Sequence, residues 1–200
     1  MGDELMPRLL DIFCGPGGAA VGYHRAGFEV VGVDHKPQRF YPFEFHLADA
    51  LEFPLEGFDA IHASPPCQAF SRLNRVWGYD YPNLIPATRE RLSKAGVPWV
   101  IENVPEAPLE NPSIICGVSV GLKIIRHRAF ETNWDLVVPS CKHVVRGDKL
   151  GLYVSMSYSP YCESDYREAM DCGWITNKEF RQAIPPAYTE FIGKQLLEYV

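Results

Sequence analysis

The 200-residue chain lacks the features that mark secreted and membrane proteins. It contains no apolar run near the ~18 residues that a transmembrane helix needs, and we find no signal peptide. Its six cysteines therefore indicate a reducing compartment, and we expect a cytoplasmic protein without a membrane partner. Internal repeats and low-complexity tracts are also lacking, and the length predicts one domain with a sizeable core.

Positive charge is scarce as well, because 19 Lys and Arg residues against 25 Asp and Glu residues leave a net charge of -6. Basic groups supply most of the nonspecific affinity for nucleic acids, so this balance does not favour a polyanionic ligand. It does not exclude one, since a local basic face can coexist with an acidic remainder. The candidates for such a face are Arg72, Arg75, Arg89, Arg91 and Lys94.

The tetrapeptide Pro65-Pro66-Cys67-Gln68 follows an apolar run at residues 58–63, which predicts a strand. Two prolines restrict the backbone, so the thiol of Cys67 is held by a stiff loop at the end of this strand. A thiol becomes a strong nucleophile as thiolate, and a loop that leads into a helix N-terminus can lower its pKa. Cys67 is therefore a candidate nucleophile, although an ordinary turn with a half-buried thiol fits the tetrapeptide alone equally well.

A glycine-rich turn near the N-terminus indicates a nucleoside site. An apolar run at residues 9–13 leads into this turn and then into a predicted helix that ends at Ala26. Missing side chains at Gly15 and Gly17 let a ligand approach the backbone. A second apolar run, residues 30–33, ends in Asp34, where a carboxylate can bind a ribose diol. A plain helix start is the alternative for the turn alone.

A third apolar run, residues 98–105, carries Glu102 and Asn103 near its end. In an open α/β sheet, chemistry gathers at the carboxyl ends of the parallel strands. We therefore expect Phe13, Asp34 and Cys67 to meet Glu102 at one crevice of a doubly wound α/β sheet. A solvated strand end is the alternative for Glu102, and a solvated basic turn is the alternative for residues 126–128.

Five motifs occur in an order that resembles the cytosine-5 DNA methyltransferases, which methylate carbon 5 of cytosine in DNA with S-adenosylmethionine. The resemblance extends from Leu9 to about Tyr199. It implies a doubly wound, mostly parallel sheet of the Rossmann-like, S-adenosylmethionine-dependent methyltransferase type, with a small inserted recognition region. The motifs are Asp11-Ile12-Phe13-Cys14-Gly15-Pro16-Gly17-Gly18, Ser64-Pro65-Pro66-Cys67-Gln68-Ala69-Phe70-Ser71, Glu102-Asn103-Val104, Arg126-His127-Arg128 and Gln182-Ala183-Ile184-Pro185-Pro186.

The resemblance implies covalent catalysis on the cytosine ring. The Cys67 thiolate adds to carbon 6, while Glu102, protonated or sharing a proton with ring N3, stabilises the developing enamine. This role requires burial to raise the pKa of Glu102, and Arg128 supplies positive charge near the base carbonyl. Arg126 is expected to brace the catalytic loop, and Asn103 is expected to orient Glu102 and the backbone around it.

The resemblance also implies a pocket for S-adenosylmethionine. Phe13 is expected against the adenine ring, Asp34 on the ribose and Asp49 near the adenine amino group. A helix N-cap or turn residue is the alternative for Asp49. The cofactor-binding residues that we expect are Phe13, Gly15, Gly17, Gly18, Asp34, Asp49, Pro65, Gln182 and Ala183.

The segment available for target recognition is shorter than the family pattern implies. We expect residues 1–200 to form one methyltransferase domain, with a reduced recognition insert at 134–164 and a C-terminal segment at 165–200 that returns to the core. The loop at 68–81 is the candidate to cover an extruded base, with Trp77, Tyr79 and Tyr81 packing there. The insert residues that could contact nucleic acid are Lys142, His143, Arg146, Lys149, Tyr153, Tyr158 and Tyr161, and a solvated hairpin with core aromatics is the alternative.

DNA is the partner that the resemblance implies. Because the segment available for target recognition is short, RNA or a free cytidine nucleotide also stays open as the substrate. A noncatalytic cofactor- or DNA-binding subunit of a larger methyltransferase is the alternative of another class. The sequence leaves the oligomeric state open. No metal is expected, because the cysteines and histidine at 141, 143, 162 and 172 match no usual zinc spacing.

Overall fold

The computed structural model describes residues 5–70, 80–141, 152–153, 163–176 and 178–200. Its centre is a seven-stranded sheet in the order β3-β2-β1-β4-β5-β8-β6. The first five strands in this order are parallel to one another, whereas β8 is antiparallel to both β5 and β6. The strands are β1 Arg8–Ile12, β2 Glu29–Asp34, β3 Glu44–Leu47, β4 Ala60–Ala63, β5 Trp99–Asn103, β6 Ser113–Cys116 and β8 His127–Thr132.

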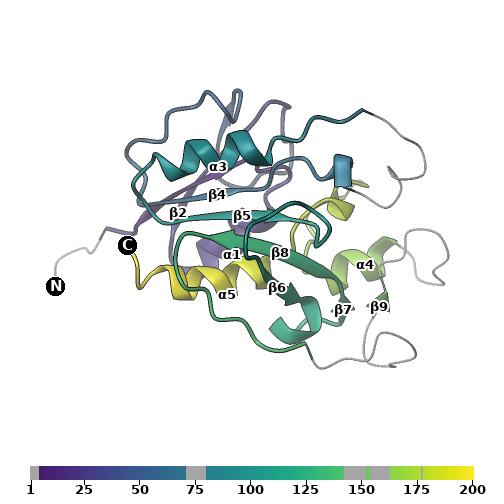
Figure 1. Cartoon of the computed structure of the whole chain (residues 1–200). Helices are drawn as coiled ribbons and strands as arrows, with labels where there is room; N and C mark the ends of the chain where they lie inside the picture. The colour runs from purple at the N-terminus through teal and green to yellow at the C-terminus, as the bar shows by residue number, and fades with distance from the viewer. Residues whose placement is uncertain (1–4, 71–79, 142–151, 154–162, 177) are drawn as a thin grey trace.

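Helices cover both faces of this sheet, which explains why its inner strands are almost continuously apolar. Figure 1 shows helix α3 (Ile85–Ser93) on one face and helices α1 (Gly18–Ala26) and α5 (Pro186–Leu196) on the other. Alternate residues of β1 face the two layers, since Leu9 packs in the cluster with α1 and α5 and Leu10 packs in the cluster with α3. The smaller elements are β7 Ile124–Ile125, β9 Leu152–Tyr153, α4 Glu163–Ala169, and the 3-10 helices η1 Gln68–Phe70, η2 Gly117–Val120 and η3 Lys178–Arg181.

The strand order reverses between β1 and β4, because the chain runs outward through β2 and β3 before it returns to place β4 beside β1. The carboxyl ends of two neighbouring parallel strands diverge at such a switch point and leave a crevice between their loops. The expected doubly wound, mostly parallel Rossmann-like sheet is therefore confirmed. The predicted strands at residues 9–13, 30–33, 58–63 and 98–105 correspond to β1, β2, β4 and β5.

Glycines allow α1 and α5 to pack unusually closely. A Cβ on Gly18 would lie 2.1 Å from the Ile184 carbonyl oxygen, and one on Gly22 would lie 2.0 Å from the Thr189 hydroxyl oxygen. That hydroxyl donates a hydrogen bond to the Ala19 carbonyl at 2.8 Å. Glycine is therefore required on this face of α1, and the C-terminal segment is held against the glycine-rich turn.

Residues 134–141, predicted as the start of the recognition insert, pack on the catalytic core. Trp134, Leu136 and Val138 pack against the cluster beneath α5, whereas Val137 is exposed. The backbone of Val137 exchanges two hydrogen bonds with the Gln195 amide, at 3.1 and 3.0 Å. The start of the recognition insert at residue 134 stays a prediction, because most of the predicted insert lies outside the described residues.

In the described part of the chain, no helix is both long and apolar enough to cross a membrane.

We predict that Gly22→Ala destabilises the protein, although alanine stabilises most helix interiors by ~1 kcal/mol relative to glycine. The added methyl group overlaps Thr189 and the Pro186 carbonyl. Overpacking of this kind costs about 1–3 kcal/mol. At about 2–4 °C per kcal/mol, thermal unfolding should show Tm lowered by roughly 2–12 °C.

Gly173→Ala is the matched control, because a Cβ at Gly173 has no neighbour within 4 Å. Its Tm should stay at the wild-type value. An increase in Tm for Gly22→Ala would contradict the close packing of α1 on α5.

Candidate active site

A cavity of about 340 Å³ lies at the carboxyl ends of β1, β2, β4 and β5. The residues that end or follow these four strands, Phe13, Asp34, Cys67 and Glu102, all line it. Its volume is within the usual range of about 300–1,000 Å³ for small-molecule sites. The predicted convergence of the four strand ends is therefore present in the structure.

The turn after β1 forms one wall of this cavity. Phe13, Gly15 and Gly17 have φ values of 58°, 50° and 88°, all in the left-handed region. Such a φ is rare for phenylalanine and costs of order 1 kcal/mol or more, and in structures it clusters at functional sites. The Asp34 carboxylate accepts the Gly15 N–H at 3.1 Å and the Lys36 N–H at 3.0 Å. Asp34 therefore joins the ends of β1 and β2.

The loop that carries Cys67 is fixed by β5. The Asn103 side-chain amide donates to the Pro65 carbonyl at 2.9 Å, and its oxygen accepts the Val104 N–H at 2.9 Å. Asn103 was expected to orient Glu102 and the backbone around it, and its hydrogen bonds hold that backbone and also the loop that carries Cys67. Cys67 then begins a single turn, in which Phe70 N–H donates to the Cys67 carbonyl at 3.0 Å.

Glu102 and Arg128 form a buried ion pair in the cavity. The Arg128 Nε lies 2.9 Å from the Glu102 Oε1, and their side chains are only 15% and 8% exposed. Burial raises the pKa of Glu102, while Arg128, Arg126 and a hydrogen bond from Ser64 act in the opposite direction. The pKa of Glu102 is raised overall, as the resemblance implied, because desolvation outweighs the effect of the nearby positive charges.

The pKa of Cys67 is raised, whereas the sequence led us to expect an environment that lowers it. Burial is the largest cause, the Glu102 carboxylate adds to it, and Arg128 acts against both. The helix that follows Cys67 is the three-residue η1, which is too short to provide a substantial dipole. Ionisation of Cys67 therefore depends on the charge state of Glu102 and on Arg128.

We predict that Glu102→Gln lowers the pKa of Cys67 and speeds its alkylation by iodoacetamide at pH 8, because it removes the neighbouring negative charge. Arg128→Gln should raise the pKa and slow the reaction. One pKa unit changes the thiolate fraction about tenfold below the pKa, so we expect changes of roughly three- to tenfold. Peptide mass spectrometry follows Cys67 separately from the other cysteines.

Glu110→Gln is the matched control, because the Glu110 side chain is 69% exposed and pairs with Arg89. It should leave the Cys67 rate unchanged. Slower alkylation in Glu102→Gln would show that the two groups are not electrostatically coupled in the predicted sense.

A buried chain of hydrogen bonds leads to Glu102, and the sequence did not reveal it. The Tyr23 hydroxyl lies 3.0 Å from His62 Nδ1, and His62 Nε2 lies 2.9 Å from the Ser64 hydroxyl, which bonds to Glu102. Burial lowers the pKa of His62 to about 3, so the imidazole is neutral. Tyr23 and His62 are both fully buried, so this series of hydrogen bonds ends inside the protein. It orients Glu102 without giving it a path to solvent. A histidine within the apolar run 58–63 was the available signal.

Arg126 braces the C-terminal segment, where we expected it to brace the catalytic loop. Its guanidinium donates to the Arg181 carbonyl at 2.9 Å and to the Met170 sulfur at 3.4 Å. The two residues that follow Arg181, Gln182 and Ala183, line the cavity as predicted. Arg126 therefore acts on the cavity through the segment that closes it.

Most of the predicted cofactor-binding residues line the cavity, but Gly17 and Asp49 do not. Gly17 caps α1 in the left-handed conformation, and a Cβ there would lie 2.7 Å from Pro42. Asp49 is exposed, and its carboxylate accepts the Leu51 N–H at 2.8 Å, which is the turn role weighed as its alternative. The predicted residues in the cavity lining are Phe13, Gly15, Gly18, Asp34, Pro65, Cys67, Glu102, Arg128, Gln182 and Ala183.

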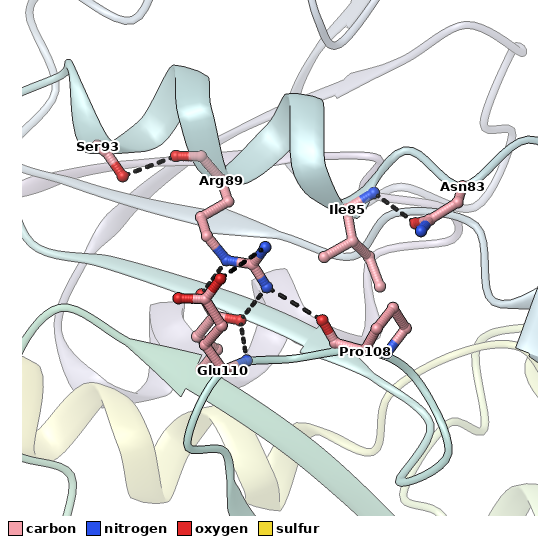
Figure 2. A network of polar contacts seen from close by, with 7 residues as sticks. Asn83, Ile85, Arg89, Ser93, Pro108 and Glu110 are labelled. Atoms are coloured by element: carbon pink, nitrogen blue, oxygen red, sulfur yellow. Dashed lines mark hydrogen bonds and ion pairs between the residues drawn. The ribbon is translucent and has the colours of Figure 1, made fainter.

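Three residues of the predicted basic face pair with other groups of the protein. Arg89 forms two hydrogen bonds to the buried Glu131, and Figure 2 shows its guanidinium directed at Glu110 and the Pro108 carbonyl. Arg91 donates to the backbone carbonyls of Ala50 and Phe53. Lys94 pairs with Glu90 on α3. These three residues therefore stabilise α3 and its neighbours, while Arg72 and Arg75 lie outside the described residues.

Several further predictions also fall outside the described residues. They concern most of the loop proposed to cover an extruded base, with Trp77 and Tyr79, and Lys142, His143, Arg146, Lys149, Tyr158 and Tyr161 of the insert. Tyr153 is described only through its backbone, which pairs with β7 in β9.

Comparison with known proteins gives a family match for part of the chain. Residues 7–83 match the model of the C-5 cytosine-specific DNA methylase family. The Type II methyltransferase M.AquIA of a Picosynechococcus species is 29% identical over 123 residues, which are 48% of this chain and 48% of that protein.

Two solved structures are also similar. A Spodoptera frugiperda DNMT2 mutant is 18% identical, with a TM-score of 0.46 over 63% of this chain and 49% of that one. The Entamoeba histolytica methyltransferase EhMeth is 15% identical, with a TM-score of 0.49 over 64% and 53%. The chain thus spans about half the length of the proteins it matches.

Proposed function

We propose that this chain, whose residues 7–83 match the C-5 cytosine-specific DNA methylase family, transfers a methyl group from S-adenosylmethionine to carbon 5 of cytosine in DNA. One observation carries the proposal. Cys67, Glu102 and Arg128, a nucleophile, an acid and a cation, line the same cavity as the glycine-rich turn. A thiol, a carboxyl group of raised pKa and a guanidinium are the groups that addition to a pyrimidine ring requires.

The residues at the other end of the cavity fit S-adenosylmethionine. A Cβ at Gly15 would have no neighbour within 4 Å, so the backbone there is open to a ligand. Phe13 offers an aromatic ring and Asp34 a carboxylate with oxygen lone pairs beyond its two backbone hydrogen bonds. Gln182 and Ala183 would close the pocket. When bound, the cofactor supplies an electrophilic methyl group on a sulfonium.

The reactive ionisation state follows from the coupling between Cys67 and Glu102. Each negative charge disfavours the other, so the thiolate forms most easily when Glu102 is protonated. A proton moved from the thiol to Glu102 gives a thiolate beside a neutral acid, and Arg128 stabilises the thiolate. The pair then holds both the nucleophile and the proton that cytosine N3 needs.

In the proposed reaction, the Cys67 sulfur forms a bond to carbon 6 while Glu102 transfers its proton to N3. Electron density moves to carbon 5, which takes the methyl group. Loss of the carbon 5 proton to a base then restores the double bond, the carbon 6–sulfur bond breaks, and N3 returns its proton to Glu102. Covalent addition overcomes the weak nucleophilicity of carbon 5 in the aromatic ring. A duplex substrate must first extrude the cytosine into the cavity.

Arg128 has two roles in this proposal. In the structure it pairs with Glu102, and its second contact, from Nη1 to the His127 carbonyl at 3.0 Å, holds the guanidinium at the cavity wall. During the reaction it would also stabilise negative charge that develops on the base carbonyl. Its removal should therefore affect the chemical step more than cofactor binding.

A free cytidine nucleotide is the second candidate substrate. It is favoured by the net charge of -6 and by the internal contacts of Arg89, Arg91 and Lys94. Tritiated cofactor incubated separately with duplex DNA, tRNA and dCMP distinguishes the substrates, and we expect label in duplex DNA. Label found only in tRNA or dCMP would identify that molecule as the substrate in place of DNA, with the same methyl transfer to cytosine.

We predict that Cys67→Ser reduces methyl transfer at least ~10³-fold, because a serine hydroxyl is a much weaker nucleophile than a thiolate. Cofactor affinity, measured by calorimetry, should change less than about threefold, since Cys67 acts on the base. Residual methylation near the wild-type rate would exclude the covalent mechanism.

We predict that Ser64→Ala moves the alkaline limb of the pH–kcat/KM profile upward by ~0.5 unit or more. The Ser64 hydrogen bond favours ionised Glu102, so its loss raises the pKa of Glu102 and keeps the acid protonated to higher pH. A purely structural defect would lower the rate without moving the limb. Ser93→Ala on α3 is the control and should leave the profile in place.

A further inference from the structure

Two metal-ligating side chains face each other at the edge of the sheet. The antiparallel register of β6 and β8 pairs Cys116, the last residue of β6, directly with His127, the first residue of β8. Directly opposed residues in such a pair have Cβ atoms about 4.5–5.5 Å apart on the same face. Backbone pairing thus places a thiol beside an imidazole with little freedom in their separation.

A third ligating group comes from the segment that packs back on the core. After Trp134, Leu136 and Val138 contact the core cluster, the chain reaches Cys141 beside the ends of β6 and β8. The Cys141 sulfur lies 3.5 Å from His127 Nε2. The two sulfurs and the imidazole nitrogen all lie within 4.8 Å of one another.

The 3.5 Å separation of the Cys141 sulfur and the His127 nitrogen matches that of two ligands on one zinc ion. With Zn–S bonds of about 2.3 Å and Zn–N bonds of about 2.0–2.1 Å, a tetrahedral ion places a sulfur and a nitrogen ligand about 3.6 Å apart. Two thiolates and an imidazole are a donor set suited to Zn²⁺ rather than to Mg²⁺ or Ca²⁺, which prefer oxygen ligands. The Cys116 sulfur also accepts a backbone N–H from Ser119, which is a suitable outer-shell contact for a metal-bound thiolate.

We propose that Cys116, His127 and Cys141 bind one Zn²⁺ ion at the edge of the sheet, apart from the catalytic cavity. None of the three lines that cavity. They provide three of the four ligands of a tetrahedral ion. The spacing of these residues, 11 and 14 positions, matches no usual zinc motif, which explains why the sequence predicted no metal site.

The site has a structural consequence for the catalytic residues. His127 lies between Arg126 and Arg128 in the chain, and its carbonyl accepts a hydrogen bond from Arg128 at 3.0 Å. A metal bond to the His127 ring fixes the start of β8 from which both arginines project. It also ties residue 141, which ends the described range 80–141, to the sheet.

Metal content of the intact protein tests the proposal. The full chain, produced in zinc-containing medium and purified with reductant and without chelator, should contain about one zinc per chain by elemental mass spectrometry. Cys116→Ser, His127→Ala and Cys141→Ser should each lower the zinc content at least about tenfold. Cys172→Ser, a buried thiol in another cluster, and His46→Ala should retain it.

A second measurement does not depend on the folding of any variant. Cobalt added to the metal-free wild-type protein should give the thiolate-to-cobalt absorption of a tetrahedral site, and zinc should abolish it. Wild-type protein that holds less than about a tenth of an equivalent of zinc and gives no such absorption would overturn the proposal. Retention of zinc in all three variants, or a Cys116–Cys141 disulfide found by peptide mapping of the fresh protein, would also overturn it.

Discussion

The buried contact between Glu102 and Arg128 determines the electrostatics of the cavity. A carboxylate at the end of β5 is almost wholly removed from water, and desolvation of this kind costs several kcal/mol unless a partner compensates it. Arg128 provides that compensation at 2.9 Å. Burial still raises the pKa of Glu102, which favours the protonated form of this carboxyl group. The raised pKa of Cys67 follows from the same arrangement, because the thiol shares the cavity with this carboxyl group.

The cavity is built from both ends of the chain. The glycine-rich turn after β1 forms one wall, and the segment that includes Gln182 and Ala183 forms another. They meet because Gly18 leaves room for the Ile184 carbonyl, and because Arg126 binds the Arg181 carbonyl. Close packing of the segment before α5 on the start of α1 therefore closes the proposed cofactor pocket. The Zn²⁺ site that we propose adds a comparable constraint at the start of β8, beside the paired arginines.

The sequence predicted the parts of the site that depend on local order. Apolar runs that end in or lead to a polar residue predicted that Asp34, Cys67 and Glu102 would meet at one cavity, since parallel strands must bring their carboxyl ends to one edge. The glycines after β1 identified the turn for the same local reason. These residues needed only the strand pattern and the topology of the sheet.

Features that depend on distant partners could not be predicted. Arg89 was a candidate for a basic face until the structure placed it on Glu131, 42 residues away. Arg126 binds groups 44 and 55 residues further along the chain, so its role changed in the same way. The direction of the Cys67 pKa depends on burial, and the thiol–imidazole cluster depends on the register of β6 and β8. Neither property is encoded in residue spacing.

The central claim is that Cys67 attacks a cytosine ring held beside Glu102 and Arg128. The most direct test is intact-mass analysis of the protein after incubation with S-adenosylmethionine and a DNA oligonucleotide that contains 5-fluorocytosine, in which fluorine replaces the proton that must leave. We predict a covalent species with the mass of the protein, one oligonucleotide and one methyl group, mapped by peptide analysis to Cys67. Absence of that species from a protein that transfers methyl groups to ordinary cytosine, or attachment at another cysteine, would contradict the account.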